Sequence, residues 1–234
     1  IASQIDGVIA VNHNLANWSS EKLQIPKNRV WYLPNFVVDN NVSQYVELPG
    51  QSGFRIVSVS NIRAQKDHLT LVNAMKLVVK EEDCAHLILV GGDVDQNLTE
   101  KVLDEIKIKG LNENISWLGL RNDVPCILRS CDIGVLSSIS EGLPLALLEY
   151  GLAGLPVVVT DVGDCRLVLD DGKYGTLIPP KNPEALAKGI LEFLHDPMSR
   201  KKIGKQLSNH IRENYGVESV INQLEDIYCQ LSKT

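Results

Sequence analysis

The sequence lacks long apolar runs, clustered positive charge and a recognisable leader. Apolar stretches such as Leu87–Val90 and Val157–Val159 have the length of core strands, far below the ~18 residues of a membrane span. Lys and Arg total 23 against 29 Asp and Glu, a formal net charge of −6, and an acidic chain without a basic stripe argues against a nucleic-acid partner. The chain starts at Ile1, and no basic segment precedes an apolar one, so we expect no signal peptide and a cytoplasmic protein.

Metal-binding and redox patterns built from cysteine and histidine are also absent. The five cysteines form no C-x-x-C pair, and the five histidines show no ligand spacing. An odd number of cysteines without such a pair indicates reduced, mostly buried thiols of a cytosolic protein rather than disulfides or a zinc site. We expect no catalytic histidine. The cysteines are Cys84, Cys126, Cys131, Cys165 and Cys229, and the histidines are His13, His68, His86, His195 and His210.

Short β-branched runs alternate with segments of helical periodicity along the 234 residues. The expected strands are Gly7–Val11, Arg29–Leu33, Phe54–Ser60, His86–Gly91, Ile115–Leu118, Ile133–Leu136, Pro156–Thr160 and Thr176–Ile178. The expected helices are Leu15–Leu23, Asp67–Lys80, Thr99–Lys109, Val124–Ser130, Leu145–Ala153, Pro183–His195, Met198–Asn214 and Glu218–Leu231. Because most strands are apolar on both faces, this alternation predicts an α/β fold with a Rossmann-like, doubly wound parallel sheet.

A polar stretch divides the chain. Residues Pro34–Gly53 contain two prolines, two glycines and three asparagines, a composition typical of a linker. The strand–helix–strand piece before it is too small to fold alone. We therefore expect residues 1–35 to be a remnant of a preceding domain, 36–53 a linker, 54–214 the Rossmann-like domain, and 215–234 a C-terminal helix that returns to the preceding domain.

The most informative stretch runs from Ser138 to Glu149. It follows the expected strand Ile133–Leu136 and opens a helix at Pro144, and such a turn lies at the edge of the sheet where doubly wound folds bind ligands. Free N–H groups at a helix start hold phosphate. The deeper carboxylate, Glu149, can accept from two ribose hydroxyls, while Glu141 lies beside the group attached to the phosphates. The alternative, that Glu149 only decorates an exposed face, fits poorly because the rest of its helix is almost wholly apolar.

The two glutamates, with seven residues between them and Gly142 after the first, resemble the retaining glycosyltransferases of family 4, the group 1 transferases with the GT-B fold. The likeness covers most of Arg55–Leu194 in the family's order. It extends through Leu87–Gly92, Trp117–Gly119, Asp132–Ser138, Gly154–Asp161 and Tyr174–Pro180, and Asp6–Val11 and Leu33–Asn35 resemble the segment before the second domain. The resemblance implies that the chain is the C-terminal, donor-binding half of a GT-B enzyme, without most of the N-terminal, acceptor-binding half.

The same resemblance implies two catalytic cations in the loop after the strand Phe54–Ser60. Lys66 matches the family's lysine before the next helix. The family often has an arginine five residues earlier, where this chain has Asn61, and Arg63 is close enough to substitute for that arginine. The position implies that Asn61 itself belongs to the donor-binding residues. Lys66 and Arg63 would face the donor diphosphate and stabilise the charge that develops as the glycosidic bond breaks.

The remaining site residues implied by the resemblance contact the donor. Glu141 would contact the donor sugar or steady an oxocarbenium-like transition state, and Glu149 would hold the ribose. Backbone N–H groups of Gly142, Leu143, Pro144 and Leu145 would assist at the diphosphate, and the loop Gly119, Leu120, Arg121 would meet the nucleobase through its backbone. The implied reaction transfers a sugar from a nucleotide-diphospho-sugar to an acceptor hydroxyl and keeps the anomeric configuration. The expectation of an acceptor in polysaccharide biosynthesis rests only on how often members of the resembled family act on such acceptors.

No cofactor and no metal are expected beyond the nucleotide-sugar itself. Asp93-Val94-Asp95 has the form of a D-x-D metal motif, but its place in a loop after a strand favours a turn or a helix cap. Two other functions stay open. One is a sugar-nucleotide 2-epimerase, which would need more acid–base groups than we find. The other is a non-catalytic nucleotide-binding module. A dehydrogenase is disfavoured because no G-x-G-x-x-G follows any expected strand.

The two ends of the chain carry apolar surface. The segment Glu218–Leu231 has an apolar stripe at helical spacing, and Val8–Val11 is apolar throughout. If these segments belong against a missing N-terminal domain, we expect the ends to pair with each other, to be mobile, or to be buried by a second copy of the chain. The missing domain would also be the route for any peripheral contact with the inner face of the membrane.

Overall fold

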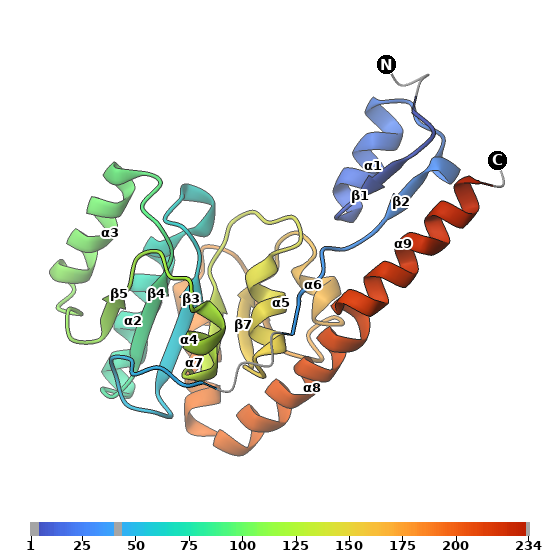
Figure 1. The fold of residues 1–234 in the computed structure, drawn as a ribbon. Coiled ribbons are helices and arrows are strands. Elements are labelled where there is room, and N and C mark those ends of the chain that lie inside the picture. The colour runs from blue at the N-terminus through green and yellow to red at the C-terminus, as the bar shows by residue number, and fades with distance from the viewer. Residues whose placement is uncertain (1–4, 40–43, 233–234) are drawn as a thin grey trace.

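The computed structural model describes residues 5–39 and 44–232. Its main body is a six-stranded parallel sheet with helices on both faces (Figure 1). The strands are β3 (Arg55–Val59), β4 (His86–Val90), β5 (Ile115–Trp117), β6 (Ile133–Leu136), β7 (Val157–Thr160) and β8 (Thr176–Ile178). This architecture is the doubly wound α/β fold that the alternation of strands and helices predicts.

The order in which successive strands are added to the sheet reverses at β3. Its order is β5-β4-β3-β6-β7-β8, so the chain builds outward from β3 to β5 and then returns to add β6 on the other side of β3. The two central strands pair over Ile56–Ile133 and Val57–Gly134. In an open parallel sheet, ligands bind beyond the carboxyl ends of the strands at such a switch point. The topology therefore points to the loops after β3 and β6.

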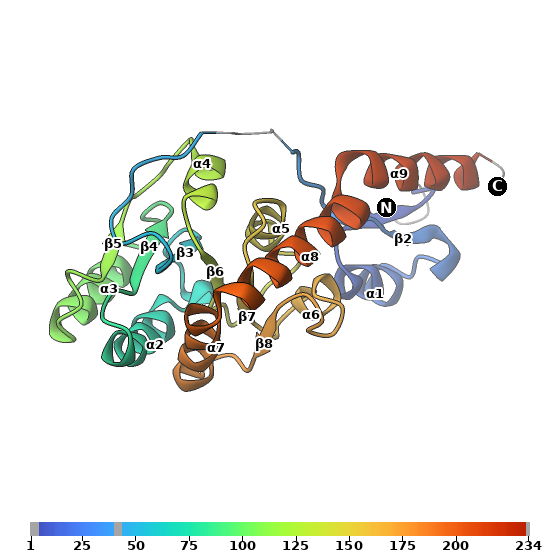
Figure 2. The ribbon, with the colours of Figure 1, turned by 90° about the horizontal axis from the view of Figure 1, so that it is seen from below.

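Helices cover the sheet in two groups (Figure 2). One face packs against α2 (His68–Glu81), α3 (Gln96–Ile108) and α7 (Pro183–His195). The other packs against α4 (Val124–Arg129), α5 (Leu145–Leu152), α6 (Cys165–Val168) and α8 (Pro197–Tyr215). Strands β4, β6 and β7 are fully buried, which explains why their sequences are apolar on both faces.

Short polar side chains start several of these helices. Asp67 caps α2 by accepting from Thr70 N, and Asp95 caps α3 by accepting from Leu98 N. Because Asp95 is the cap, α3 begins at Gln96, three residues before the expected start at Thr99. The aspartates of the D-x-D sequence thus fill structural roles, since Asp93 Oδ1 also accepts from Thr99 Oγ1 at 2.7 Å.

The first part of the chain forms a small separate unit. Strands β1 (Val8–Ala10) and β2 (Val30–Tyr32) pair in parallel and are connected through α1 (His13–Lys22) and a 3-10 turn at Lys27–Arg29. This unit lies beside α9 (Val217–Leu231), away from the main sheet (Figures 1 and 2). The Trp31 indole N–H donates to Gln230 Oε1 at 3.0 Å, so the two ends of the chain contact each other.

Several details differ from the sequence predictions. The four-residue helix α6 was not expected, because it is too short to show a helical period. The expectation of mostly buried cysteines is wrong, since only Cys131 and Cys165 are buried while Cys84 and Cys229 are exposed. All five are free thiols. Within the described residues, no helix is both long and apolar enough to cross a bilayer.

Candidate active site

A cavity of about 460 Å³ lies at the carboxyl edge of the sheet, over the switch point. Its walls come from the loops after β3, β4, β5 and β6 and from the first two turns of α5. The lining residues are Asn35, Val59, Ser60, Asn61, Arg63, Lys66, Val90, Gly91, Leu120, Arg121, Val124, Glu141, Leu143, Pro144, Leu145, Ala146 and Glu149. All three expected catalytic residues and seven of the nine expected donor contacts line this one space.

Lys66 and Glu141 form an ion pair in this cavity. The Lys66 ammonium lies 2.6 Å from Glu141 Oε1, and the same oxygen accepts from Ser138 Oγ at 2.6 Å. Their side chains are 24% and 10% exposed, so water screens the pair less than it screens a surface pair. The backbone reinforces this contact, because Ile139 N donates to Gln65 O at 2.8 Å. The loops after β3 and β6 are therefore held together where the pair forms.

Arg63 differs from the other two cations of the cavity. Arg121 makes a two-bond contact with Asp123, at 2.7 and 2.6 Å, and this contact raises the pKa of Arg121 and lowers that of Asp123. Lys66 is paired with Glu141. The exposed guanidinium of Arg63 has no hydrogen-bond or ionic partner among the described residues. It is therefore the cation most available to an incoming anion.

Asn61 fastens one wall of the cavity to another. Its Oδ1 accepts from Gly92 N at 2.7 Å, which ties the loop after β3 to the turn after β4. The neighbouring Gly91 has φ 152°, and a Cβ there would lie 2.1 Å from Ser60 O, so only glycine fits. At the position where the resemblance leads one to expect an arginine, Asn61 thus contributes an amide and a tight loop contact instead of charge.

Glu149 lies on α5 with its carboxylate facing the cavity. Burial raises the pKa of Glu149, and the carboxylate has no hydrogen-bond partner in the described part of the chain. It also borders a second, mostly apolar cavity of about 280 Å³ between α4, α5 and residues 36–39. A partly buried carboxylate without hydrogen-bond partners is unfavourable. This arrangement suits a residue that binds a ligand with hydrogen-bond donors.

The start of α5 offers backbone donors, with one correction. The sequence suggests Pro144 as the first helical residue and a backbone donor, but Pro144 is the N-cap residue, α5 begins at Leu145, and proline has no N–H. The N–H groups of Leu145 and Ala146 have no acceptor among the described residues. Two free donors and the positive end of the helix therefore border the cavity.

Two expected donor contacts do not line the cavity. Gly119 has φ +67°, and its carbonyl accepts from Gly91 N at 2.9 Å. The carbonyl of Gly142 accepts from Asp164 N at 2.9 Å, and a Cβ on Gly142 would lie 2.8 Å from Asn12 Nδ2. Both glycines shape loops whose neighbours line the cavity, Leu120 and Arg121 in one case and Glu141 and Leu143 in the other.

Sequence reasoning missed several lining residues, among them Asn35, Val59, Ser60 and Val90. Val59, Ser60 and Val90 occupy the last positions of the strands expected at Phe54–Ser60 and His86–Gly91. Their position at the carboxyl edge was the available signal, because neither valine nor serine forms a motif by itself.

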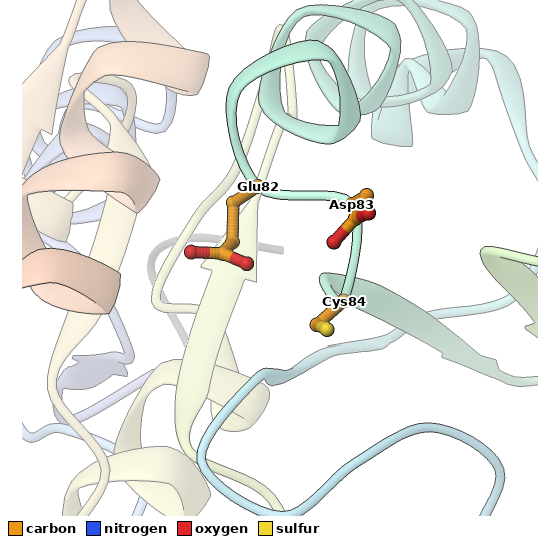
Figure 3. A group of neighbouring side chains, drawn as sticks. All are labelled: Glu82, Asp83 and Cys84. Carbon is orange, nitrogen blue, oxygen red and sulfur yellow. The ribbon is translucent and has the colours of Figure 1, made fainter.

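Another group of potential metal ligands lies far from this cavity in the fold. Glu82, Asp83 and Cys84 place one ligand atom each within 4.8 Å of one another, on the turn between α2 and β4 (Figure 3). That turn precedes β4 and so lies at the amino edge of the sheet, opposite the cavity. Asp83 accounts for the main part of the raised pKa of the Cys84 thiol, which opposes formation of the thiolate that binds metals.

Comparison with known proteins gives consistent relatives. Residues 46–210 match the family described as "Glycosyl transferases group 1". The chain is 28% identical over 233 residues to the N-acetyl-alpha-D-glucosaminyl L-malate synthase of Bacillus anthracis, covering 96% of this chain and 60% of that protein. It is 27% identical over 231 residues to the phosphatidyl-myo-inositol mannosyltransferase of Mycobacterium leprae, covering 96% and 59%. The chain thus spans about three fifths of the length of these two relatives.

Solved structures share the fold. The Anabaena protein HepE, solved in complex with UDP and glucose, superposes with a TM-score of 0.84 at 20% identity over 96% of this chain and 63% of HepE. The C-terminal domain of a group 1 family glycosyl transferase from Francisella tularensis has a TM-score of 0.69 at 22% identity, covering 77% of this chain and 99% of that domain.

The architecture is that of the C-terminal half of a GT-B glycosyltransferase, with a parallel sheet whose strand order reverses at β3, beneath the cavity of about 460 Å³. Because the family match extends over most of the chain, the protein belongs to the group 1 glycosyl transferases.

Proposed function

We propose that this chain binds a nucleotide-diphospho-sugar at the carboxyl edge of its sheet. The observation that supports this most directly is that the Glu149 carboxylate and the Arg63 guanidinium border the same cavity and have no hydrogen-bond or ionic partner within residues 5–39 and 44–232. A carboxylate that lacks donors suits ribose hydroxyls, and a free cation suits a diphosphate. The UDP and glucose in the HepE complex, together with the names of the relatives, favour a nucleotide-sugar over other anions.

We propose a role for each side chain from its position in the cavity. Glu149 accepts from the ribose hydroxyls, while Arg63 and the N–H groups of Leu145 and Ala146 bind the diphosphate. The loop at Leu120 and Arg121 lies beside the nucleobase. Lys66 contacts the diphosphate in addition to its ion pair with Glu141. Glu141 keeps its hydrogen bond from Ser138 and lies next to the sugar.

We further propose that the enzyme transfers the sugar to an acceptor hydroxyl with retention of configuration. As the glycosidic bond breaks, negative charge grows on the leaving diphosphate, where Lys66 and Arg63 stabilise it; preorganised groups of this kind contribute roughly 3–4 kcal/mol each to the rate. Glu141 stabilises positive charge at the anomeric carbon. These side chains and the start of α5 neutralise the diphosphate without a metal ion.

We propose that residues 1–35, with β1, α1 and β2, are part of an acceptor-binding domain, that 36–53 connect it to the donor domain at 54–214, and that α9, in 215–234, returns to it. Asn12 at the start of α1 approaches Gly142, so this acceptor-side unit contacts the loop that holds Glu141.

A panel of UDP-, GDP- and ADP-sugars in a thermal-shift assay tests donor binding directly. A ligand at 100 times its Kd stabilises the folded chain by about 2.7 kcal/mol, which raises the melting temperature measurably. We expect one nucleotide to stand out and Glu149→Ala to abolish the shift. No shift with any of the three would refute donor binding. Turnover by an enzyme with both domains, and none by this chain, would separate the transferase from a binding module.

A further inference from the structure

The imidazole of His68 is buried directly beneath the candidate site. His68 is the first residue of α2 and is 3% exposed. Its Nε2 lies 3.1 Å from Oγ of Ser60, the residue that follows β3 and lines the cavity. Its Nδ1 is buried and has no hydrogen-bond partner in the part of the chain that the structure describes. Neither Ser60 nor His68 has a role in the donor binding proposed above.

The burial of Nδ1 determines which ring nitrogen carries the proton. Burial, helped by the charge of Lys66 and opposed by that of Asp67, lowers the pKa of His68 to about 4, so the ring is neutral near pH 7 and has a single N–H. On Nδ1 that proton would be a buried donor without an acceptor, which is rarer and more costly than an unused lone pair. The proton therefore lies on Nε2, and the ring donates to Ser60 Oγ.

This contact leaves the Ser60 hydroxyl available as a hydrogen-bond donor. Because Oγ accepts from His68 and makes no second hydrogen bond among the described residues, its own proton is free to be donated into the cavity. Arg63 and Lys66 line the same cavity, and all three groups come from the end of β3 and the loop that follows. A directed hydroxyl donor beside two cations matches the oxygens of a phosphate.

We infer that Ser60 is a further binding residue for the donor's diphosphate, and that His68 is a positioning residue that holds the Ser60 hydroxyl as a donor. This inference rests on the proposed function, because the diphosphate is that of the nucleotide-sugar. It distinguishes His68 from a histidine that only fills the core, since a purely structural imidazole would leave phosphate affinity unchanged once the fold is intact.

Calorimetric titration of UDP, GDP and ADP, each beside its nucleoside, tests the inference on four proteins: the wild-type chain, Ser60→Ala, His68→Leu and His68→Gln. For the diphosphate that binds, Ser60→Ala should weaken affinity roughly 10- to 100-fold and His68→Leu about 3- to 10-fold. His68→Gln keeps an N–H near the position of Nε2 and should restore most of the affinity. The matching nucleoside, which lacks phosphate, should bind all four proteins equally.

The double variant Ser60→Ala/His68→Leu should bind no more weakly than Ser60→Ala alone, because His68 acts through Ser60. Equal losses for nucleoside and diphosphate, or additive losses in the double variant, would overturn the inference. If His68→Leu does not fold, Ser60→Ala and His68→Gln still decide it. Wild-type binding with unchanged variants would refute the inference alone, whereas a wild-type chain that binds none of the three nucleotides would refute the proposed function with it.

Discussion

The phenol oxygen of Tyr150 lies 2.6 Å from the backbone nitrogen of Val59 and accepts its hydrogen bond. The β3–β6 pairing extends only through Ile56 and Val57 on β3, so this side chain satisfies a donor that the sheet leaves open. Its hydroxyl also donates to Val135 O on β6 at 3.3 Å. A single fully buried tyrosine thus connects α5 to both central strands. Tyr150 directly follows Glu149 in the chain, and its partner Val59 directly precedes Ser60.

Removing this hydroxyl should weaken the fold. In Tyr150→Phe the partly buried Val59 N–H loses its acceptor, and we expect the free energy of unfolding to fall by about 1–3 kcal/mol. Urea denaturation measures the change. Tyr228→Phe, at a side chain that is 61% exposed, is the matched control and should unfold at the wild-type urea concentration. Equal midpoints for the two variants would mean that the Tyr150 contact contributes nothing net.

Glu149→Gln should weaken nucleotide binding and stabilise the empty chain. The neutral amide is a poorer acceptor for ribose hydroxyls, so affinity should fall by roughly 1.5–3 kcal/mol, the range of hydrogen bonds to a charged group. The same change removes a partly buried carboxylate that has no hydrogen-bond partner in the described part of the chain and is therefore costly to ionise. Calorimetry with UDP or GDP measures the first effect, and thermal melting without nucleotide measures the second.

The stabilisation by Glu149→Gln should depend on pH in a defined direction. Burial raises the pKa of Glu149 above its ordinary 4.5. A raised pKa favours the folded state below the ordinary value, and this contribution is lost as the pH rises through the folded pKa. The variant should therefore match wild type near pH 4 and gain its advantage toward pH 7. A difference in melting temperature that is constant with pH would show that ionisation of Glu149 is not its cause.

Lys66→Met should lower affinity for a nucleoside diphosphate much more than affinity for the nucleoside. Loss of the ammonium removes a charged hydrogen bond to phosphate, and we expect a decrease of roughly 10- to 100-fold. The control is Lys188→Met, because Lys188 belongs to a loose, exposed pair with Glu192 at 3.9 Å on α7. Equal effects of the two substitutions on affinity would show that Lys66 does not contact the diphosphate.

Gly163→Ala should displace the loop that holds Glu141. Gly163 has φ +55°, and a Cβ there would lie 2.3 Å from Glu141 O and 2.5 Å from Gly142 O. We expect weaker nucleotide binding and a loss of stability of about 1–3 kcal/mol. Gly110→Ala separates the causes, since Gly110 has φ +68° with nothing within 4 Å of the added Cβ. The two variants share the backbone strain, and only Gly163→Ala should affect binding.

Chelation should leave nucleotide binding unchanged. The two aspartates of the D-x-D sequence are engaged at the start of α3, Asp95 as its cap and Asp93 with Thr99. Titration of UDP or GDP before and after EDTA checks this expectation. A large loss that Mn²⁺ restores, and that Asp93→Ala abolishes, would assign this loop to a metal after all.

The fold was accessible from the sequence because its signals are local. The run Leu87–Val90 is apolar at every position, and such runs alternate with helical periods throughout residues 54–214. These patterns describe a parallel sheet covered on both faces whatever the detailed packing. The sequence did not predict the short helix α6, because its four residues contain about one helical turn, too little for a period to be recognised.

The roles of individual site residues depend on neighbours that are distant in the chain. Lys66 and Glu141 are 75 residues apart, and their 2.6 Å contact exists because β3 and β6 are adjacent in the sheet. Sequence alone proposed both residues for the site but not their pairing. It likewise read Asn61 as a departure from a pattern, while the folded chain uses its side chain to fasten the turn at Gly92.

By itself, then, the sequence determined the α/β class, the strands, and the set of loops that border the candidate site, because periodicity, caps and loop motifs are contained in consecutive residues. Only the tertiary structure decided which charges are neutralised, which remain free and which histidine lies beneath the site. Pairing and burial depend on contacts between side chains and backbone groups of different elements. The contacts are those of Ser60 with His68, Lys66 with Glu141, and Tyr150 with Val59. Strand order brings most of them together, and no local pattern encodes their distances.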